Sequence, residues 1–217
     1  MRGAAMTGGL RARRMRAVAA ACAALLAATS GCVPPPSSFS VGPRRPDCRI
    51  AILPLSNYAP TREAPERVAP MLASEIGRLP GVEVVDPGAV EAVLAKEPWL
   101  LMDRIPPDLV DRFGADLHAD ALLVGSVLAY GNRESASEKI PQISLSLRLI
   151  ETPGGRVLWS AVHSRDGSDG EWLFGLGRVQ SLEQLGSQVV MEMLETFPAR
   201  GAGRESRKDG IAKGSGE

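Results

Sequence analysis

The sequence predicts an α/β (α+β) fold, a single domain with a mixed sheet of about five strands and helices packed on it, in the order βαβααβββα. Three patterns predict it. Short apolar runs bounded by proline and glycine are typical of buried strands. Between them, apolar residues recur every three or four positions, which is typical of helices. Later in the chain, apolar and polar residues alternate, which indicates a strand with one wet face. The predicted domain spans residues 48–197.

The first part of the domain is predicted to hold two strands with a helix between them. The apolar run 49–55 predicts a buried strand, and 82–85 predicts a second. Residues 61–79 predict a helix, because apolar side chains follow one face at Val68, Leu72, Ile76 and Leu79. Pro65 suits the first turn, whereas Pro70 predicts a kink or the true start of this helix.

Two further helices are predicted before a central strand. Asp86 followed by Pro87 indicates an N-cap and the first position of a helix that runs to Ala95. The next helix is predicted over residues 107–117. The run 121–130 is almost continuously apolar, so we expect a central strand covered on both faces.

The last part is predicted to form a hairpin and a final helix. After a polar loop over residues 131–141, apolar residues at 143, 145, 147 and 149 alternate with polar ones. A Pro-Gly-Gly turn at 153–155 leads to the strand 156–164. The helix begins near Ser181, where Ser181 and Gln184 have the spacing of a capping box.

The first 31 residues have the composition of a secretory signal peptide. Arginines precede Ala17–Gly31, an uncharged run of 15 residues, whereas a membrane-spanning helix needs about 20 strongly apolar residues. Cleavage of the signal removes five arginines and no acidic residue. The mature chain then has 20 basic and 25 acidic residues, a net charge of −5. A nucleic-acid-binding protein needs a basic surface, and this charge argues against one.

Residues 28–32 (ATSGC) resemble the lipobox of bacterial lipoproteins, with Thr29 where leucine is most common. The resemblance implies cleavage between Gly31 and Cys32 and a covalent lipid on Cys32. The alternative is an ordinary signal peptide with a chance cysteine. Several acyl chains hold a protein stably on a membrane. Because Val33 and not aspartate follows the cysteine, we expect the periplasmic face of the outer membrane, with the inner membrane less favoured.

The segments that flank the domain are predicted to be extended or unstructured. Residues 32–47 contain Pro34–Pro36 and Pro43, so we expect a proline-rich tether. Residues 198–217 lack apolar periodicity and are predicted to form a disordered tail. Cys22 leaves with the signal, and Cys48 is expected to be a small apolar residue at the start of a strand, with no internal disulfide.

Four segments carry a resemblance to a known family: residues 52–57 (ILPLSN), 82–86 (VEVVD), 116–130 (DLHADALLVGSVLAY) and 147–161 (LRLIETPGGRVLWSA). In this order and spacing they resemble the α/β domain shared by curli-assembly (CsgG-type) lipoproteins, penicillin-binding-protein activator (LpoB-type) lipoproteins and the amino-terminal domain of TolB-like proteins. Residues 151–155 depart from the pattern, because these families more often have an aspartate and a Thr-Gly turn there.

No catalytic residues, metal site or cofactor other than the lipid are predicted, and we expect no enzyme. His118, at a helix end, and His163, expected on the wet face of its strand, have no partners at metal-ligand spacing. Ser126 lies inside a strand and not in a nucleophile elbow. The acidic residues scatter over predicted helix exteriors.

Candidate partner surfaces are Trp172, Leu173 and Phe174 beside a glycine-rich loop, and Trp99 between two helices; the alternative is that they cover the edge of the core. Trp159 is expected to be structural.

The leading interpretation is a lipid-anchored accessory protein that binds and scaffolds or regulates envelope machinery for secretion, assembly or peptidoglycan synthesis. A subunit of a curli-type secretion channel is disfavoured, because the loops 131–141 and 165–177 are too short for pairs of spanning strands of about 9–11 residues. A self-associating module without a pore is a third possibility.

Overall fold

The computed structural model describes residues 35–41, 47–96, 105–135, 138–171 and 176–198. They form two units. One contains Pro35–Gly167 and the residues from Val179 onward, and it holds all the elements named below. The other contains Met1–Pro34 and Ser168–Arg178. In its described part, the Glu171 amide donates to the Ser168 carbonyl at 2.9 Å, and Arg178 pairs with Glu171 at 3.1 Å.

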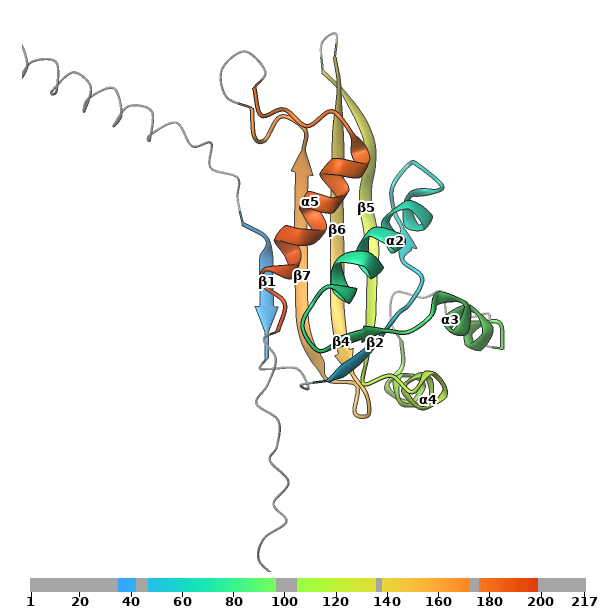
Figure 1. Ribbon diagram of the computed structural model, residues 1–217. Coiled ribbons are helices and arrows are strands. Elements are labelled where there is room, and N and C mark those ends of the chain that lie inside the picture. Colours follow the sequence, from blue (N-terminus) through green and yellow to red (C-terminus); the bar gives the residue numbers. More distant parts are fainter. Residues whose placement is uncertain (1–34, 42–46, 97–104, 136–137, 172–175, 199–217) are drawn as a thin grey trace, which may run out of the picture. The chain divides into compact units, whose positions relative to one another are not determined.

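A seven-stranded mixed sheet organises the larger unit (Figure 1). Its order is β1-β7-β6-β5-β2-β4, and β3 pairs with β5 beside this path. The β1–β7, β7–β6 and β6–β5 pairs are antiparallel, whereas β2 pairs in parallel with β5 and β4. The strands are β1 (Ser37–Ser40), β2 (Cys48–Ile52), β3 (Ser56–Asn57), β4 (Val82–Val84), β5 (Ala121–Ser135), β6 (Glu138–Glu151) and β7 (Val157–Asp166).

Helices cover both faces of the sheet. Helices α2 (Ala64–Gly77) and α5 (Leu182–Leu194) lie over one face, where they run across β5, β6 and β7 in Figure 1. Helices α3 (Pro87–Leu94) and α4 (Pro107–Leu117) pack on the other face, against β2 and the first residues of β5. Two apolar cores result, because successive residues of β2 and β5 point to opposite faces.

The helices begin and pack much as their sequences predict. The Asp86 side chain accepts the Ala89 amide at the start of α3, and the Ser181 hydroxyl accepts the Gln184 amide at the start of α5. Buried Val68, Leu72 and Ile76 form the inner face of α2. The helix continues through Pro70, so the proline does not mark its start.

Sequence reasoning predicted the α/β class and the element order, and both are confirmed for the core elements β2 to α5. Three boundaries were wrong. Residues 131–141 are not a polar loop, because β5 continues to Ser135 and β6 begins at Glu138. The strand predicted over 49–55 ends at Ile52, and β3 follows it. In the predicted tether, residues 37–40 form β1 and pair with β7.

Candidate functional site

The predicted anchor and partner residues lie outside the described part of the chain. Gly31 and Cys32 fall in residues 1–34, and Trp99 falls in 97–104. Residues 172–175 contain Trp172, Leu173 and Phe174. Lipidation and the partner surface therefore stay predictions.

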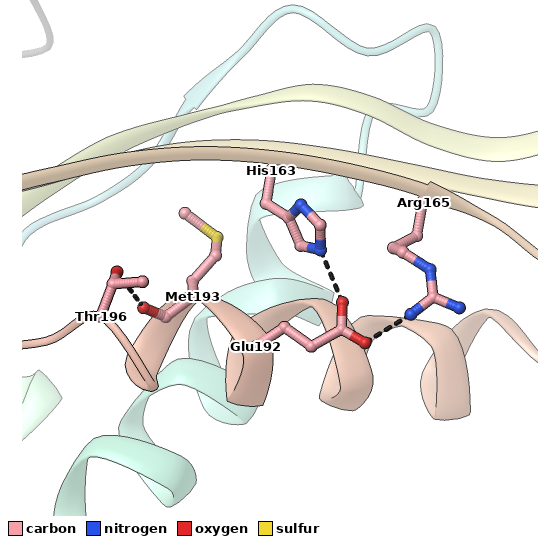
Figure 2. A network of polar contacts seen from close by, with 5 residues as sticks. All are labelled: His163, Arg165, Glu192, Met193 and Thr196. Atoms are coloured by element: carbon pink, nitrogen blue, oxygen red, sulfur yellow. Dashed lines mark hydrogen bonds and ion pairs between the residues drawn. The ribbon is translucent and has the colours of Figure 1, made fainter. Parts of the chain in front are cut away.

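The described residues include a buried polar network between β7 and α5 (Figure 2). One carboxylate oxygen of Glu192 lies 2.5 Å from His163 Nε2, and its other oxygen accepts a hydrogen bond from Arg165. His163 is 4% exposed and Arg165 7%. The prediction that His163 lies on the wet face was wrong. It shares a face with the buried Trp159, four residues earlier in the same strand.

The same interface is held at its other end by Trp159. Its indole nitrogen donates to the Thr196 hydroxyl at 3.1 Å, and that hydroxyl donates to the Met193 carbonyl at 2.7 Å. The Trp159 ring also meets Phe197 edge to face, with centroids 5.0 Å apart. Trp159 is fully buried, which confirms its expected structural role. The network around Glu192 joins the same two elements, so it too holds α5 on the sheet.

Two side chains near the start of α5 have shifted pKa values. The Ser181 hydroxyl donates to the exposed Glu183 carboxylate at 2.7 Å, and this hydrogen bond lowers the pKa of Glu183. Burial raises the pKa of the Tyr130 hydroxyl, and the negative charge of Glu183 raises it further. Neither group adjoins a partner arranged for proton transfer in the described residues.

A cavity of 1080 Å³ opens on the α3/α4 face of the sheet. Leu94, Ile105 and Val157 form apolar parts of its wall, while Ser126 and Ser146 are neighbours across β5 and β6 and add hydroxyl groups. Of the described residues that line it, the titratable ones are Tyr58 and Arg148. Such a lining suits binding more than catalysis, because its serines have no histidine or carboxylate beside them to act as a general base.

An exposed apolar cluster lies beside β1, which sequence reasoning assigned to the tether. Phe39 is 55% exposed, Val41 44% and Val162 43%, and we call these three residues the β1 patch. They are joined by the pairing of β1 with β7, in which Phe39 lies opposite Ser160 and Ser37 opposite Val162. The alternation of serine with Phe39 and Val41 is a period-two signal that could have predicted this strand.

The remaining predicted positions are in ordinary structural environments. Cys48 is 2% exposed at the start of β2, as predicted. His118 ends α4 in a left-handed conformation, with Nδ1 2.8 Å from the Ala115 carbonyl. Within the described ranges, no three His, Cys, Asp or Glu side chains gather closely enough to hold a metal ion. Nor does any helix there have the length and apolar character needed to cross a membrane.

A scan against protein-family models found no match, and a search of curated proteins found no similar sequence. Solved structures do match. The PelC dodecamer from Paraburkholderia phytofirmans shares 18% identity, with 76% of this chain and 98% of the PelC chain covered, at a TM-score of 0.52.

Two other matches have lower TM-scores. Lipoprotein GNA1162 from Neisseria meningitidis matches at 23% identity over 69% of this chain and 99% of that one, with a TM-score of 0.47. The LpoB C-terminal domain from Salmonella enterica matches at 10% identity over 56% of this chain and 84% of that one, with a TM-score of 0.44. At such identities the likeness to PelC shows a shared fold and nothing finer, and the resemblance to CsgG-type and TolB-like proteins stays a prediction.

Proposed function

We propose that this chain is a lipid-anchored accessory protein of the bacterial envelope. Cys32 carries the lipid and holds the protein at the periplasmic face of the outer membrane. The domain binds envelope machinery and scaffolds or regulates it, without a catalytic step or a cofactor of its own. The observation that carries the proposal is the Gly31-Cys32 pair that closes an uncharged run behind an arginine cluster.

The described residues support a binding role over a chemical one. The one buried cluster of ionisable groups described above joins α5 to β7 and does not adjoin the cavity. The cavity has hydroxyl groups and one cation but no general base among its described lining residues. A domain with such surfaces is suited to holding a partner in place.

Metabolic labelling with a tagged fatty acid tests the anchor. The wild-type chain should take up the label, and Cys32→Ala should lose it and be released from the membrane fraction. Cys48→Ala is the matched control and should keep the label, because Cys48 is buried in the domain. A wild type without label, or label that survives Cys32→Ala, would refute the anchor.

The binding role needs its own test. A photo-crosslinking amino acid at position 172 or 99 should give an adduct with one defined envelope protein in intact cells. The control is the same amino acid at Met191, which is exposed on α5. Equal adducts from all three positions, or none at 172 and 99, would contradict the predicted partner surface.

Self-association is a second candidate, and the likeness to a PelC dodecamer favours it. A shared fold does not by itself imply a shared assembly, because proteins of one fold differ in what they bind. Self-association therefore needs its own test. Sedimentation of the mature chain at several concentrations should then give a species larger than a monomer. A monomer at every concentration would argue against it.

A further inference from the structure

We propose that the β1 patch lies against the lipid surface to which Cys32 is attached, so that the membrane is a second contact of the domain and not only the site of its anchor. The inference rests on the proposed lipidation and deepens it, because it states which surface faces the lipid. Three observations carry it: the length of chain between Cys32 and β1, the gathering of exposed apolar side chains there, and the charges around them.

The chain between the cysteine and the sheet is short. Ser37 is the first residue of β1 and follows Cys32 by five positions. Five residues span at most about 18 Å when fully extended. Phe39 lies two strand residues beyond Ser37, about 7 Å further. Because β1 is paired with β7, an anchor at Cys32 cannot lift this edge of the sheet more than about 25 Å from the lipid.

The edge that this short connection holds near the lipid is apolar on its surface. Seven large apolar side chains are exposed among the described residues, and three of them form the β1 patch. Phe39 and Val162 are diagonal neighbours across the β1–β7 pair, about 7–8 Å apart between their Cα atoms, so an aromatic ring reaches the valine. Exposed clusters of this kind mark contacts with a protein or a membrane.

On this face, the described strand residues paired in line with the patch include none of the acidic side chains that an anionic lipid surface would repel. Two rows of paired residues cross β1, β7, β6 and β5 on this face, and their members are serines, apolar residues and one arginine: Phe39, Ser160, Arg148 and Val124 in one row, and Ser37, Val162, Ser146 and Ser126 in the other. The mature chain as a whole has five more acidic than basic residues. The acid-free rows are therefore a local property, and they place no carboxylate beside the patch that would repel anionic headgroups.

A test of this contact is independent of lipidation in the cell. The mature chain, residues 32–217, contains every described residue and is prepared without its signal. The Cys32 thiol is coupled to a maleimide lipid in vesicles of phosphatidylethanolamine and phosphatidylglycerol with brominated acyl chains. Cys48 is 2% exposed and shielded from the reagent. The fluorescence of a tryptophan introduced by Phe39→Trp reports whether the patch contacts the brominated chains. The emission of the native tryptophans, measured on the unsubstituted chain, is subtracted.

Met191→Trp is the matched control. Met191 is 46% exposed on α5, which covers the opposite face of the sheet. We expect the tryptophan introduced at position 39 to lose most of its emission to the brominated chains, and the one at position 191 to lose little. Val162→Asp, added to Phe39→Trp, should restore the emission, since a carboxylate then faces the headgroups.

The opposite results are equally clear. Equal quenching at positions 39 and 191, or quenching at neither on coupled protein, would overturn the membrane contact. A shift in the emission of the Phe39→Trp chain with protein concentration, in the absence of vesicles, would also overturn it and assign the patch to a second copy of this chain. In this experiment the lipid is attached to Cys32 by the maleimide reaction and not by the cell. These outcomes are therefore independent of the fatty-acid labelling, which alone tests the lipidation of Cys32.

Discussion

Gly114 lies where α4, the start of β5 and the turn after β6 meet. A Cβ atom placed on it would lie 2.5 Å from Thr152 Cβ and 2.7 Å from its hydroxyl oxygen. Thr152 is only 3% exposed, its hydroxyl donates to the Ala119 carbonyl, and its amide donates to the Asp120 carbonyl at 2.9 Å. The threonine cannot move aside without breaking these bonds, so a larger residue at 114 must displace backbone.

We expect Gly114→Ala to destabilise the domain. Alanine favours a helix over glycine by about 1 kcal/mol, but overpacking a rigid site costs about 1–3 kcal/mol, and the contact here is far shorter than normal. The net loss in the free energy of unfolding, measured by urea denaturation, should be about 1–2 kcal/mol.

Gly77→Ala is the control for that measurement, because it is the same substitution at a site with room for the added methyl group. A Cβ on Gly77, at the end of α2, would lie 3.8 Å from Val84 Cγ2, an ordinary contact. This variant should be neutral or more stable by up to about 1 kcal/mol. A stable Gly114→Ala variant would show that Thr152 is free to move.

Single residues were predictable where their neighbours in the sequence decided the environment, as at Cys48. His163 was not, although the alternation of β7 carried the signal. Trp159, Ala161, His163 and Arg165 share one parity, and the buried Trp159 sets the face for all four. Because histidine is polar, sequence reasoning placed His163 on the solvent-exposed face instead. The compensating Glu192 is 29 residues away in the sequence, and no local pattern indicates it.

At the scale of elements, Glu192 is one of the residues that attach α5 to the sheet. Its side chain is 29% exposed, while the His163 and Arg165 side chains that it meets are 3% and 8% exposed. Removing one partner of a buried ion pair costs about 3–5 kcal/mol, because the other charge stays desolvated. The partial exposure of Glu192 reduces that figure, since water then screens part of the interaction.

We therefore expect Glu192→Gln to lower the free energy of unfolding by about 2 kcal/mol. The amide keeps the shape of the side chain but removes the negative charge beside Arg165. Glu195→Gln is the matched control at the C-cap of the same helix, where the residue is exposed, and it should change stability by less than about 0.5 kcal/mol. Equal effects of the two variants in thermal or urea unfolding would contradict a structural role for the network.

The hairpin of β5 and β6 shows why one element was missed. Its outer part contains Arg133, Glu134 and Lys139, which suggested a polar loop. In the structure these residues still pair strand to strand, with Glu134 opposite Lys139, and Arg133 also forms an ion pair with Asp166 at 2.9 Å. Neither apolar core includes a described residue of this part, so the apolar alternation by which a strand is recognised from sequence is missing.

At the scale of the whole molecule, the order of the core elements was predictable because each has its own pattern and buries an apolar face. Strand β1 was not, because its four residues are all exposed and no helix covers them. Neither apolar core includes a residue of β1. It is bound to the domain by its ladder with β7 alone among the described contacts of the sheet.

This arrangement predicts that β1 is dispensable for folding. A chain that starts at Asp47 loses the ladder, worth about 0.5–1.5 kcal/mol for each hydrogen bond, but no longer has to order residues at about 1–2 kcal/mol each. The two effects nearly cancel, so the free energy of unfolding should stay within about 2 kcal/mol of the mature chain. By hydrogen exchange, the amides of Ser160 and Val162, which face β1, should exchange faster, while those of β5 and β6 stay protected. Phe39→Ser in the full mature chain is the control, since it keeps the ladder and should leave these amides slow. If the shortened chain fails to fold, β1 is part of the core structure; if it folds as expected, β1 is a separable connection between the domain and the anchor at Cys32.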